Sequence, residues 1–472
     1  MTCNIAAQRF MFILAFLVVL TFGSCKKNNS EFTIPKNNDS TKVDAPTPVK
    51  GKEYTLLPDA DGRLVIDGAK VPYKGGDVLN LKGKFSAIYI SKLNGSVSSP
   101  IIIRNVPGSV TTIGNPNWDG GSWAEGISLV TCHYIMIGGD KSASDFIIDG
   151  SVKGNRGSYF NLVISKGSDN IEVRNLTIRN GGTGIWAKTD PVKSDPSTWY
   201  PNSTMQNLSI HGVVISGTDN EAMYIGHTAT YWNLDVNTNN SYYGDPSGFT
   251  PGNQYVQPIK WNNVKIFNNK VSNGGADGIQ TAAINNLEVY NNTVTNWGIK
   301  HNSSHNGGIL IGGRTTNTYV HDNYVHDGWG ELLQFFGSGE NGAKHVFHNN
   351  LFVNNSVGGN DGVNLRGTDN PAVTFTNNTI AQTGGVSLRL NGEKGMKAAI
   401  IVNDNAFIQP RMSGGSLAAN AYVYTENGAQ ALEGAGDKAN ARIATVDAAK
   451  VDVANFFLPL GDSPLGVTGY RK

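Results

Sequence analysis

The sequence is poor in cysteine and in charge. Three cysteines, Cys3, Cys25 and Cys132, are too few for a disulfide framework in a chain of 472 residues. Charged residues make up only 16% of the chain, and 38 Lys+Arg against 37 Asp+Glu leave a net charge of +1, so we do not expect nucleic acid or an anionic membrane surface as the main partner. Glycine is abundant instead, with 57 residues, and together with the low charge it argues against helical bundles and coiled coils.

The N-terminal segment has the pattern of an export signal. Arg9 precedes an apolar run over residues 10–22, which is too short to span a bilayer stably, and Gly23-Ser24-Cys25 follows it directly. Small residues before a cysteine resemble a bacterial lipoprotein signal over residues 1–25, which implies that Cys25 is diacylated; ordinary cleavage and an uncleaved anchor are the alternatives. Residues 26–53 are predicted to be a flexible tether. We therefore expect an exported protein, held at the bacterial outer membrane by lipid alone and facing either the periplasm or the cell exterior.

An internal repeat predicts the fold. A unit of the form Asn-hydrophobic-x-hydrophobic-x-Asn-Asn-x-hydrophobic recurs through the second half of the chain. Its second asparagine falls, at steps of 23, 31, 27, 28 and 27 residues, at Asn269, Asn292, Asn323, Asn350, Asn378 and Asn405. Such a period is typical of a solenoid coil. Each unit holds two short strands split by Asn or Asp, which tolerate the left-handed backbone of a sharp bend, and stacked coils would place the asparagines in one hydrogen-bonded ladder.

A third short strand completes each unit. The segments are GIWAK from Gly184, AMYIG from Ala222, GIQTA from Gly278, GILIG from Gly308, LLQFF from Leu332, GVNLR from Gly362 and GVSLR from Gly385. Three short strands per coil without helical periodicity predict an all-β fold, a single right-handed parallel β-helix over residues 54–410 with long loop insertions. Its core is expected to contain Val271, Val294, Val325, Phe352, Ile380 and Phe407. Residues 411–472 are expected to cap the open end of the solenoid.

These repeats support a family resemblance. Together with GGDVLNLKGKF from Gly75, SSPIIIRN from Ser98 and the FFLPLGDSPLG ending from Phe456, they resemble exported bacterial proteins of the pectate-lyase-like superfamily. Members of that superfamily include lyases, hydrolases, epimerases and binding or adhesion proteins, so the resemblance implies a carbohydrate ligand. The G-D-D, G-H-G and R-I-K set of polygalacturonases and the R-x-P-x-x-R pattern of the best-known pectate lyases are both missing from the sequence. The catalytic residues therefore cannot be assigned by motif.

Candidate acids come from one column of the third strands. When these strands are aligned on their first apolar residue, the position two residues earlier holds Thr183, Glu221, Asp277, Gly307, Gly330, Asp361 and Gly384. Glu221 and Asp277 lie on adjacent coils, about 5 Å apart in the backbone. Their like charges need compensation, either by a bridging cation such as Ca²⁺ or by protonation of one carboxyl. The alternative is that each carboxylate caps the amides of a turn.

Candidate cations come from a second column. The position three residues after the same apolar residue holds Lys188, Gly226, Ala282, Gly312, Phe335, Arg366 and Arg389. Arg366 and Arg389 are therefore expected to stack on adjacent coils, and Lys188 to lie one coil from the level of Glu221. Such side chains can bind a substrate carboxylate as cations. When desolvation keeps one of them neutral, it can instead accept a proton. A solvated basic face that pairs with acidic neighbours is the alternative.

Two predicted insertions, at about residues 189–205 and 228–259, leave the stack beside these strands. Long loops on a rigid scaffold usually serve function. They carry the aromatic residues Trp199, Tyr200, Tyr231, Trp232, Tyr242, Tyr243, Phe249 and Tyr255. We expect about half of these rings to stack on sugar and the rest to pack the loops. His301 and His305, in KHNSSHNGG, have no Cys or carboxylate at zinc-like spacing, so a metal role for them is the weaker interpretation.

The expected function is that of a monomeric carbohydrate-active protein whose partner is a polysaccharide or oligosaccharide. In the preferred hypothesis, a polysaccharide lyase, Ca²⁺ on Glu221 and Asp277 neutralises a uronate and Lys188 or His227 takes the C5 proton. The glycan would be held by Trp186, Tyr224, Gln280, Trp199, Trp232, Arg366 and Arg389. A glycoside hydrolase that uses the two carboxyls is the related alternative. A non-catalytic, lipid-anchored glycan-binding or surface-scaffold protein is the hypothesis from another class.

Overall fold

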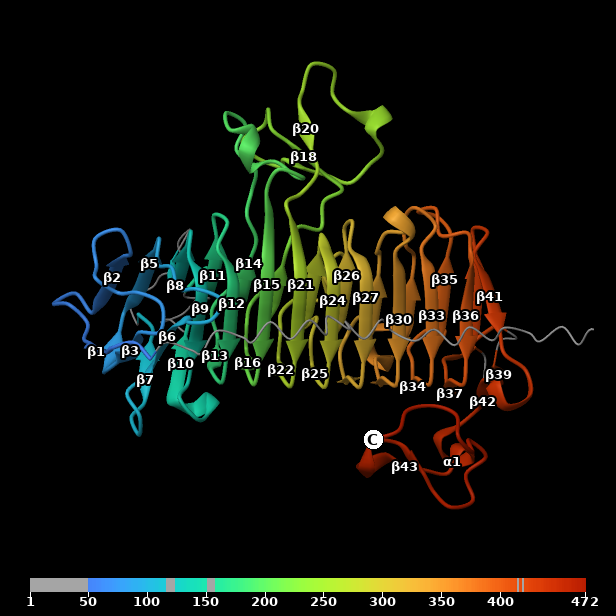
Figure 1. The fold of residues 1–472 in the computed structure, drawn as a ribbon. Coiled ribbons are helices and arrows are strands. Elements are labelled where there is room, and N and C mark those ends of the chain that lie inside the picture. The colour runs from blue at the N-terminus through green and yellow to red at the C-terminus, as the bar shows by residue number, and fades with distance from the viewer. Residues whose placement is uncertain (1–49, 116–123, 151–157, 414–415, 418–419) are drawn as a thin grey trace, which may run out of the picture. The chain divides into compact units, whose positions relative to one another are not determined.

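Three long parallel sheets surround one apolar core (Figure 1). The computed structural model describes residues 50–115, 124–150, 158–413, 416–417 and 420–472, all of which belong to the unit Thr47–Lys472. The predicted signal over residues 1–25, its Cys25 and nearly all of the predicted tether over 26–53 lie outside the described residues. In the part that is described, no helix combines the length and the apolar character that a membrane span requires.

The strands follow a three-sheet coil. Within the described residues the first sheet has 13 strands, from β1 (Glu53–Leu56) to β41 (Gln430–Glu433). The second and third sheets have 12 strands each, from β4 (Lys84–Phe85) to β42 (Ala441–Ile443) and from β2 (Arg63–Asp67) to β40 (Val423–Glu426). Each strand pairs in parallel with strands of the coils before and after it, which confirms the predicted parallel β-helix.

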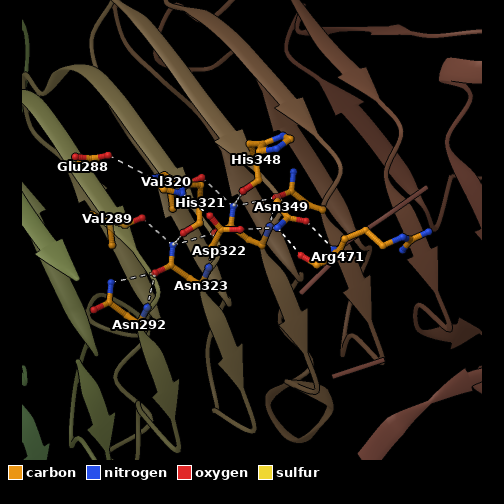
Figure 2. A network of polar contacts seen from close by, with 12 residues as sticks. Glu288, Val289, Asn292, Val320, His321, Asp322, Asn323, His348, Asn349 and Arg471 are labelled. Carbon is orange, nitrogen blue, oxygen red and sulfur yellow. Dashed lines mark hydrogen bonds and ion pairs between the residues drawn. The ribbon is translucent and has the colours of Figure 1, made fainter. Parts of the chain in front are cut away.

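The predicted asparagine ladder is confirmed. Each ladder side chain donates to the Oδ1 of the next, from Asn269 through Asn292, Asn323, Asn350, Asn378 and Asn405, and the ladder ends at Asn440. The same amides donate to main-chain carbonyls, as Asn323 does to Val289 in Figure 2. The residue before each of the six predicted ladder asparagines takes the left-handed conformation, for example Asp322 with φ 55°. The corner is thus fixed by an Asn or Asp at the bend and a buried amide after it.

The C-terminal prediction is wrong in two respects. First, β40, β41 and β42 add one more strand to each sheet, so the solenoid continues past residue 410. Second, the segment that contains α1 (Val446–Ala449), β43 (Val451–Asp452) and β44 (Leu458–Pro459) packs against the outer face of the second sheet instead of capping the open end.

The outer face of the second sheet explains this docking. Its strands β31 (Leu351–Val353), β34 (Thr379–Ala381) and β37 (Ala406–Ile408) are buried along their whole length. Phe352 and its column neighbours fill the inner core, as predicted. The outward residues Leu351, Val353, Ala381, Ala406 and Ile408 are apolar as well and cluster with Val451, Phe457, Leu465 and Tyr470 of the C-terminal segment. A strand with apolar side chains on both faces needs a cover outside as well as a core inside.

The two predicted insertions are present and project from one side of the helix (Figure 1). The first joins β14 (Thr183–Ala187) to β15 (Thr204–His211). The second joins β17 (Met223–Ile225) to β21 (Lys260–Phe267). It contains a small antiparallel sheet of β18 (Tyr231–Asn233), β19 (Ser241–Tyr242) and β20 (Tyr255–Val256). Both insertions leave the solenoid next to the third-sheet strands that carry the predicted acids.

Candidate active site on the third sheet

The site is built on the outer face of the third sheet. The strands that carry it are β14, β17 and β23 (Ile279–Ala282). Trp186, Tyr224 and Gln280 are in register on these strands, and the residues on either side of each belong to the core. Because side chains alternate along a strand, these three residues point away from the core. Gln280 is nevertheless buried, so the strip is recessed between flanking side chains.

Glu221 and Asp277 lie side by side, as predicted. The amide of Ala222 donates to the carbonyl of Asp277, and the amide of Gly184 donates to that of Glu221, which places Thr183, Glu221 and Asp277 on successive coils. The Thr183 hydroxyl donates to Oε2 of Glu221 at 3.3 Å. The Gly307 amide donates to Oδ1 of Asp277 at 2.5 Å. One oxygen of each carboxylate is therefore held by the protein, and Asp277 is completely buried.

His305, which the sequence analysis named but did not place at this site, compensates the two acids. Nδ1 of His305 lies 3.3 Å from Oε1 of Glu221 and 3.6 Å from Oδ2 of Asp277. Its contacts with Asp277 and Glu221, against the effect of burial, raise the pKa of His305 to about 10. Burial, with a contribution from the charge of Glu221, raises the pKa of Asp277 to about 6 despite His305 and the Gly307 amide. Burial also opposes ionisation of Glu221, but contacts with His305 and Thr183 outweigh it and lower the pKa of Glu221.

The loop that carries His305 is tied down at several points. It lies between β25 (Thr293–Thr295) and β26 (Ile309–Gly312). The buried indole of Trp297 donates to the carbonyl of Asn306 at 2.9 Å. Lys300 forms an ion pair of 2.6 Å with Asp219, and His301 stacks on Trp329. These contacts are tertiary, so spacing along the sequence gave no sign that His305 returns to the acidic pair.

The donor set at this centre does not fit the expected Ca²⁺. Calcium prefers roughly six to eight oxygen ligands. The cluster found among the described residues offers one oxygen each from Glu221 and Asp277 and a nitrogen from His305, all within 4.8 Å of one another. In addition, the Gly307 amide already occupies the second oxygen of Asp277. We therefore assign no step of a reaction to Ca²⁺.

Lys188 lies beside the acids in an aromatic setting. Its Nζ is 4.4 Å from the ring centroid of Tyr224 and 5.0 Å from that of Trp186. Burial lowers the pKa of Lys188, and the nearby charges of Asp190 and Glu221 only partly offset this effect. An amine whose pKa is lowered by desolvation is a suitable general base. The structure thus brings Lys188, Glu221, Trp186 and Tyr224 together as the sequence predicted.

His227 and most of the loop aromatics serve the packing of the insertions. His227 is buried, contacts Asp190 at 2.9 Å through Nε2 and packs edge-on against Trp232, and burial lowers its pKa. Trp232 is itself buried, so the expectation that its ring stacks on sugar from an exposed wall is wrong. The Trp199 indole donates to the carbonyl of Val192 within the first insertion. The mutually packed rings of the second insertion are Tyr231, Tyr242, Phe249 and Tyr255.

The register of the later coils differs from the predicted alignment. Ile309 pairs with Leu333, not Leu332, so Glu331 takes the column position predicted for Gly330. Val363 pairs with Leu388, so Arg389 lies opposite Asn364 and does not stack on Arg366. The strands that contain Leu333 and Leu388 each offer two apolar residues on which they could be aligned. The prediction used the first of the two, and this choice was wrong.

The two arginines also differ in their partners. Arg389 forms ion pairs with Asp361 and Glu426, so it matches the alternative of a cation paired with acidic neighbours. Arg366 lies over the Phe336 ring at 4.1 Å, and its Nε has no hydrogen-bond partner among the described residues. Burial lowers the pKa of Arg366. Of the two, Arg366 retains hydrogen-bonding capacity for a ligand.

A separate cavity lies at a corner of the C-terminal coils. It has a volume of about 730 Å³, and its lining includes Asn354, Gln382, Gln409 and Arg411. The described residues around it include no carboxylate and no imidazole.

Comparisons with known proteins agree with this architecture. Residues 259–429 match the family model described as right handed beta helix region. A comparison with curated proteins found no match. Among solved structures, lacto-N-biosidase GH136 from Eubacterium ramulus is 13% identical with a TM-score of 0.54, and the alignment covers 84% of this chain and 68% of that chain.

Two further structures are more distant. Pectate lyase Pel9A is 11% identical over 90% of this chain and 91% of that chain, with a TM-score of 0.43. An alginate lyase from Paenibacillus sp. str. FPU-7 is 13% identical over 68% and 95%, with a TM-score of 0.36. Identities this low concern the fold alone. The chain is thus a right-handed parallel β-helix protein, as its sequence predicts.

Proposed function

We propose that this protein is a carbohydrate-active enzyme whose site is the outer face of β14, β17 and β23. The observation that carries the proposal is the position of Lys188, a desolvated amine over two aromatic rings and next to the compensated acids Glu221 and Asp277. Aromatic faces and convergent polar groups on a recessed strip are what a sugar ring requires of a binding site. Lys188 is half-buried and has no ion-pair partner among the described residues, and such partial desolvation of a charge is costly, which favours a catalytic role for the amine.

The favoured reaction is β-elimination on a uronate-containing polysaccharide. The neutral amine of Lys188 takes the C5 proton, the electron pair forms the C4–C5 double bond, and the bond from C4 to the bridging oxygen breaks. The leaving oxygen takes a proton from water. The ring faces of Trp186 and Tyr224 orient the sugar. The outer nitrogen of His305, which has no hydrogen bond from the described residues, is available to the uronate carboxylate.

The test is the product that is formed. The full chain is incubated with a panel of uronate-rich and neutral polysaccharides, while ultraviolet absorbance of unsaturated uronate and release of reducing ends are followed in parallel. Unsaturated product that disappears in Glu221→Gln, but persists in Glu172→Gln on the first sheet, supports the lyase. Turnover retained by a folded Glu221→Gln variant contradicts the site assignment.

Glycoside hydrolysis is the second candidate, favoured by the short separation of the two carboxyl groups. Their nearest ligand atoms lie within 4.8 Å of each other, which is closer to the spacing of retaining enzymes than to that of inverting ones. Reducing ends without unsaturated product would select this reaction. If neither product forms but the protein is retarded in gels that contain polysaccharide, the non-catalytic scaffold is the correct function.

We also propose that the enzyme is exported and anchored through Cys25. The support is the apolar run over residues 10–22 followed by Gly23-Ser24-Cys25. Metabolic labelling with a radioactive fatty acid should mark the wild-type protein and not Cys25→Ser. Equal labelling of the two would exclude this anchor.

A further inference from the structure

The Glu221, Asp277 and His305 centre has two buried atoms without a hydrogen-bond partner. These atoms are Oδ2 of Asp277 and Nδ1 of His305. They are 3.6 Å apart, and Nδ1 is 3.3 Å from Oε1 of Glu221. Leaving a buried donor or acceptor unsatisfied costs about 1–3 kcal/mol, and more for a charged group. Unsatisfied buried polar groups in a folded protein require an explanation, and an ion bound between them is one.

Two of the three separations between ligand atoms match those around a tetrahedral metal ion, and all three atoms lie within 4.8 Å of one another. When metal–ligand bonds are about 2.0–2.1 Å long, two ligands of a tetrahedral site lie ~3.3–3.4 Å apart. The distances from Nδ1 to the two carboxylate oxygens are 3.3 and 3.6 Å. One imidazole nitrogen with two carboxylate oxygens is a donor set that suits Zn²⁺, Mn²⁺ or Co²⁺ better than Ca²⁺.

The surrounding contacts orient the donors toward the same point. Gly307 holds Oδ1 of Asp277 and leaves Oδ2 without a hydrogen bond, while Thr183 holds Oε2 of Glu221 and leaves Oε1 to face His305. Such outer contacts fix ligand orientation in metal sites. The His305 side chain is 41% exposed, whereas those of Glu221 and Asp277 are 11% and 0% exposed. An exchangeable fourth ligand would therefore approach from the side of His305.

We propose that Glu221, Asp277 and His305 form a binding site for one divalent transition-metal ion, with Oε1, Oδ2 and Nδ1 as ligands. Imidazole binds a metal as the neutral base, so binding releases the proton that Nδ1 otherwise carries. Catalytic use of the ion rests on the proposed function, but binding does not, and it is measured without substrate.

The test is a metal titration of the full chain after treatment with a chelator. Co²⁺ is the first probe, because its visible absorption reports nitrogen and oxygen ligands directly, and Zn²⁺ and Ca²⁺ are then added as competitors. We expect one Co²⁺ per chain, displaced by Zn²⁺ and not by Ca²⁺. Because loss of outer contacts alone typically weakens metal sites 10- to 100-fold, His305→Ala should weaken binding by roughly 100-fold or more.

Two variants keep the result interpretable. His301→Ala lies in the same loop, but its ring stacks on Trp329, and it should bind Co²⁺ like the wild type. Glu221→Gln keeps the shape of the side chain and should also lose binding, with the far-ultraviolet circular dichroism unchanged. Co²⁺ binding that survives in His305→Ala, displacement of Co²⁺ by Ca²⁺ at equal concentration, or no binding by the folded wild type would each overturn the proposal. Binding without glycan turnover would leave the metal site intact and count against the proposed function only.

Discussion

The side-chain amide of Asn323 donates to Oδ1 of Asn350 at 2.9 Å, and both side chains are fully buried. The Oδ1 of Asn323 in turn accepts from the main-chain and side-chain amides of Asn292. One side chain thus serves three successive coils (Figure 2). Because stacked coils contact only their neighbours, loss of one ladder residue weakens two interfaces at once.

Asn323→Ala should therefore destabilise the protein by about 3 kcal/mol or more, since it leaves several buried groups without partners. The measurement is the urea concentration at the midpoint of unfolding, compared between variants that share the same dependence of the unfolding free energy on urea. Asn286→Gly is the control, because Asn286 belongs to an exposed ladder with Asn263 and has φ 62°, which glycine adopts freely. The Asn286→Gly substitution should lower the free energy of unfolding by less than about 1 kcal/mol. Equal effects of the two substitutions would show that burial of the ladder does not matter.

The fold was predictable because its signal is local and repeated. An Asn or Asp at each bend, a buried Asn after it and an apolar residue such as Val325 two positions later fix the register in every coil. A slip by one residue would put an amide into the core and an apolar side chain at the bend. The strand that contains Arg389 has two apolar starting points, Val386 and Leu388, and pairing through Leu388 cannot be read from the pattern.

The site was predictable only in part. Glu221, Asp277 and Lys188 lie next to strands whose order follows from the repeat, and they come together as expected. His305 reaches the pair through a loop held by Trp297, so its position depends on tertiary contacts. The strands LFV from Leu351 and AFI from Ala406 are apolar on both faces, so the sequence indicates that their outer face is covered. The pattern of a strand does not say which segment covers that face.

Lys188→Met should abolish turnover while leaving the protein as stable as the wild type, or more stable by up to ~2 kcal/mol. Methionine removes a half-buried charge that has no ion pair within the described residues, and the loss of the cation–π contacts with Trp186 and Tyr224 offsets part of the gain. Thermal unfolding and product formation are measured on the same sample. Lys265→Met, which breaks a surface ion pair of 2.9 Å with Glu288, should retain activity.

The pH dependence of the proposed reaction should also reflect Lys188. Burial lowers the pKa of Lys188, so kcat/KM should rise with pH and level off below the pH expected for an ordinary lysine. The unfolded chain binds more protons than the folded one between the lowered pKa and the ordinary value. Stability should therefore rise with pH across that window, and Lys188→Met should lack this rise. A rate that falls as the pH increases would contradict the role of the amine as base.

His345 predicts a loss of stability in acid. It is fully buried, Nε2 donates to the carbonyl of Ser338 at 2.9 Å, and Nδ1 accepts from the Thr318 hydroxyl at 3.0 Å, so the ring is neutral. Burial lowers the pKa of His345 to about 4. The unfolded state binds the extra proton between pH 4 and an unfolded pKa of about 6.5, so this residue should cost roughly 3 kcal/mol of stability as the pH falls through that window.

The measurement for His345 is the free energy of unfolding in urea at several pH values. His345→Gln cannot be protonated in this range, so its stability should depend less steeply on pH than that of the wild type. His326→Gln is the control, since His326 pairs with Asp327 at the surface corner and does not face the core. Parallel pH profiles for the wild type and His345→Gln would exclude His345 as the source of the acid sensitivity.

Asn349 should control how firmly the C-terminal segment is attached. Its Nδ2 donates to the carbonyl of Arg471 at 2.7 Å, and its Oδ1 accepts from the Arg471 amide at 2.7 Å (Figure 2). Asn349→Gly preserves the left-handed backbone of φ 51° but removes both bonds, together with the bond that Nδ2 donates to Asp322 of the preceding coil. A loss of about 1–2 kcal/mol should speed amide exchange in residues 446–472 roughly 5- to 30-fold while leaving the coils protected. Asn377→Gly, at the same position of the next coil and without a bond to Arg471 in the described structure, should leave that exchange unchanged. If both variants exchange like the wild type, the apolar cluster around Tyr470 is sufficient to hold the segment.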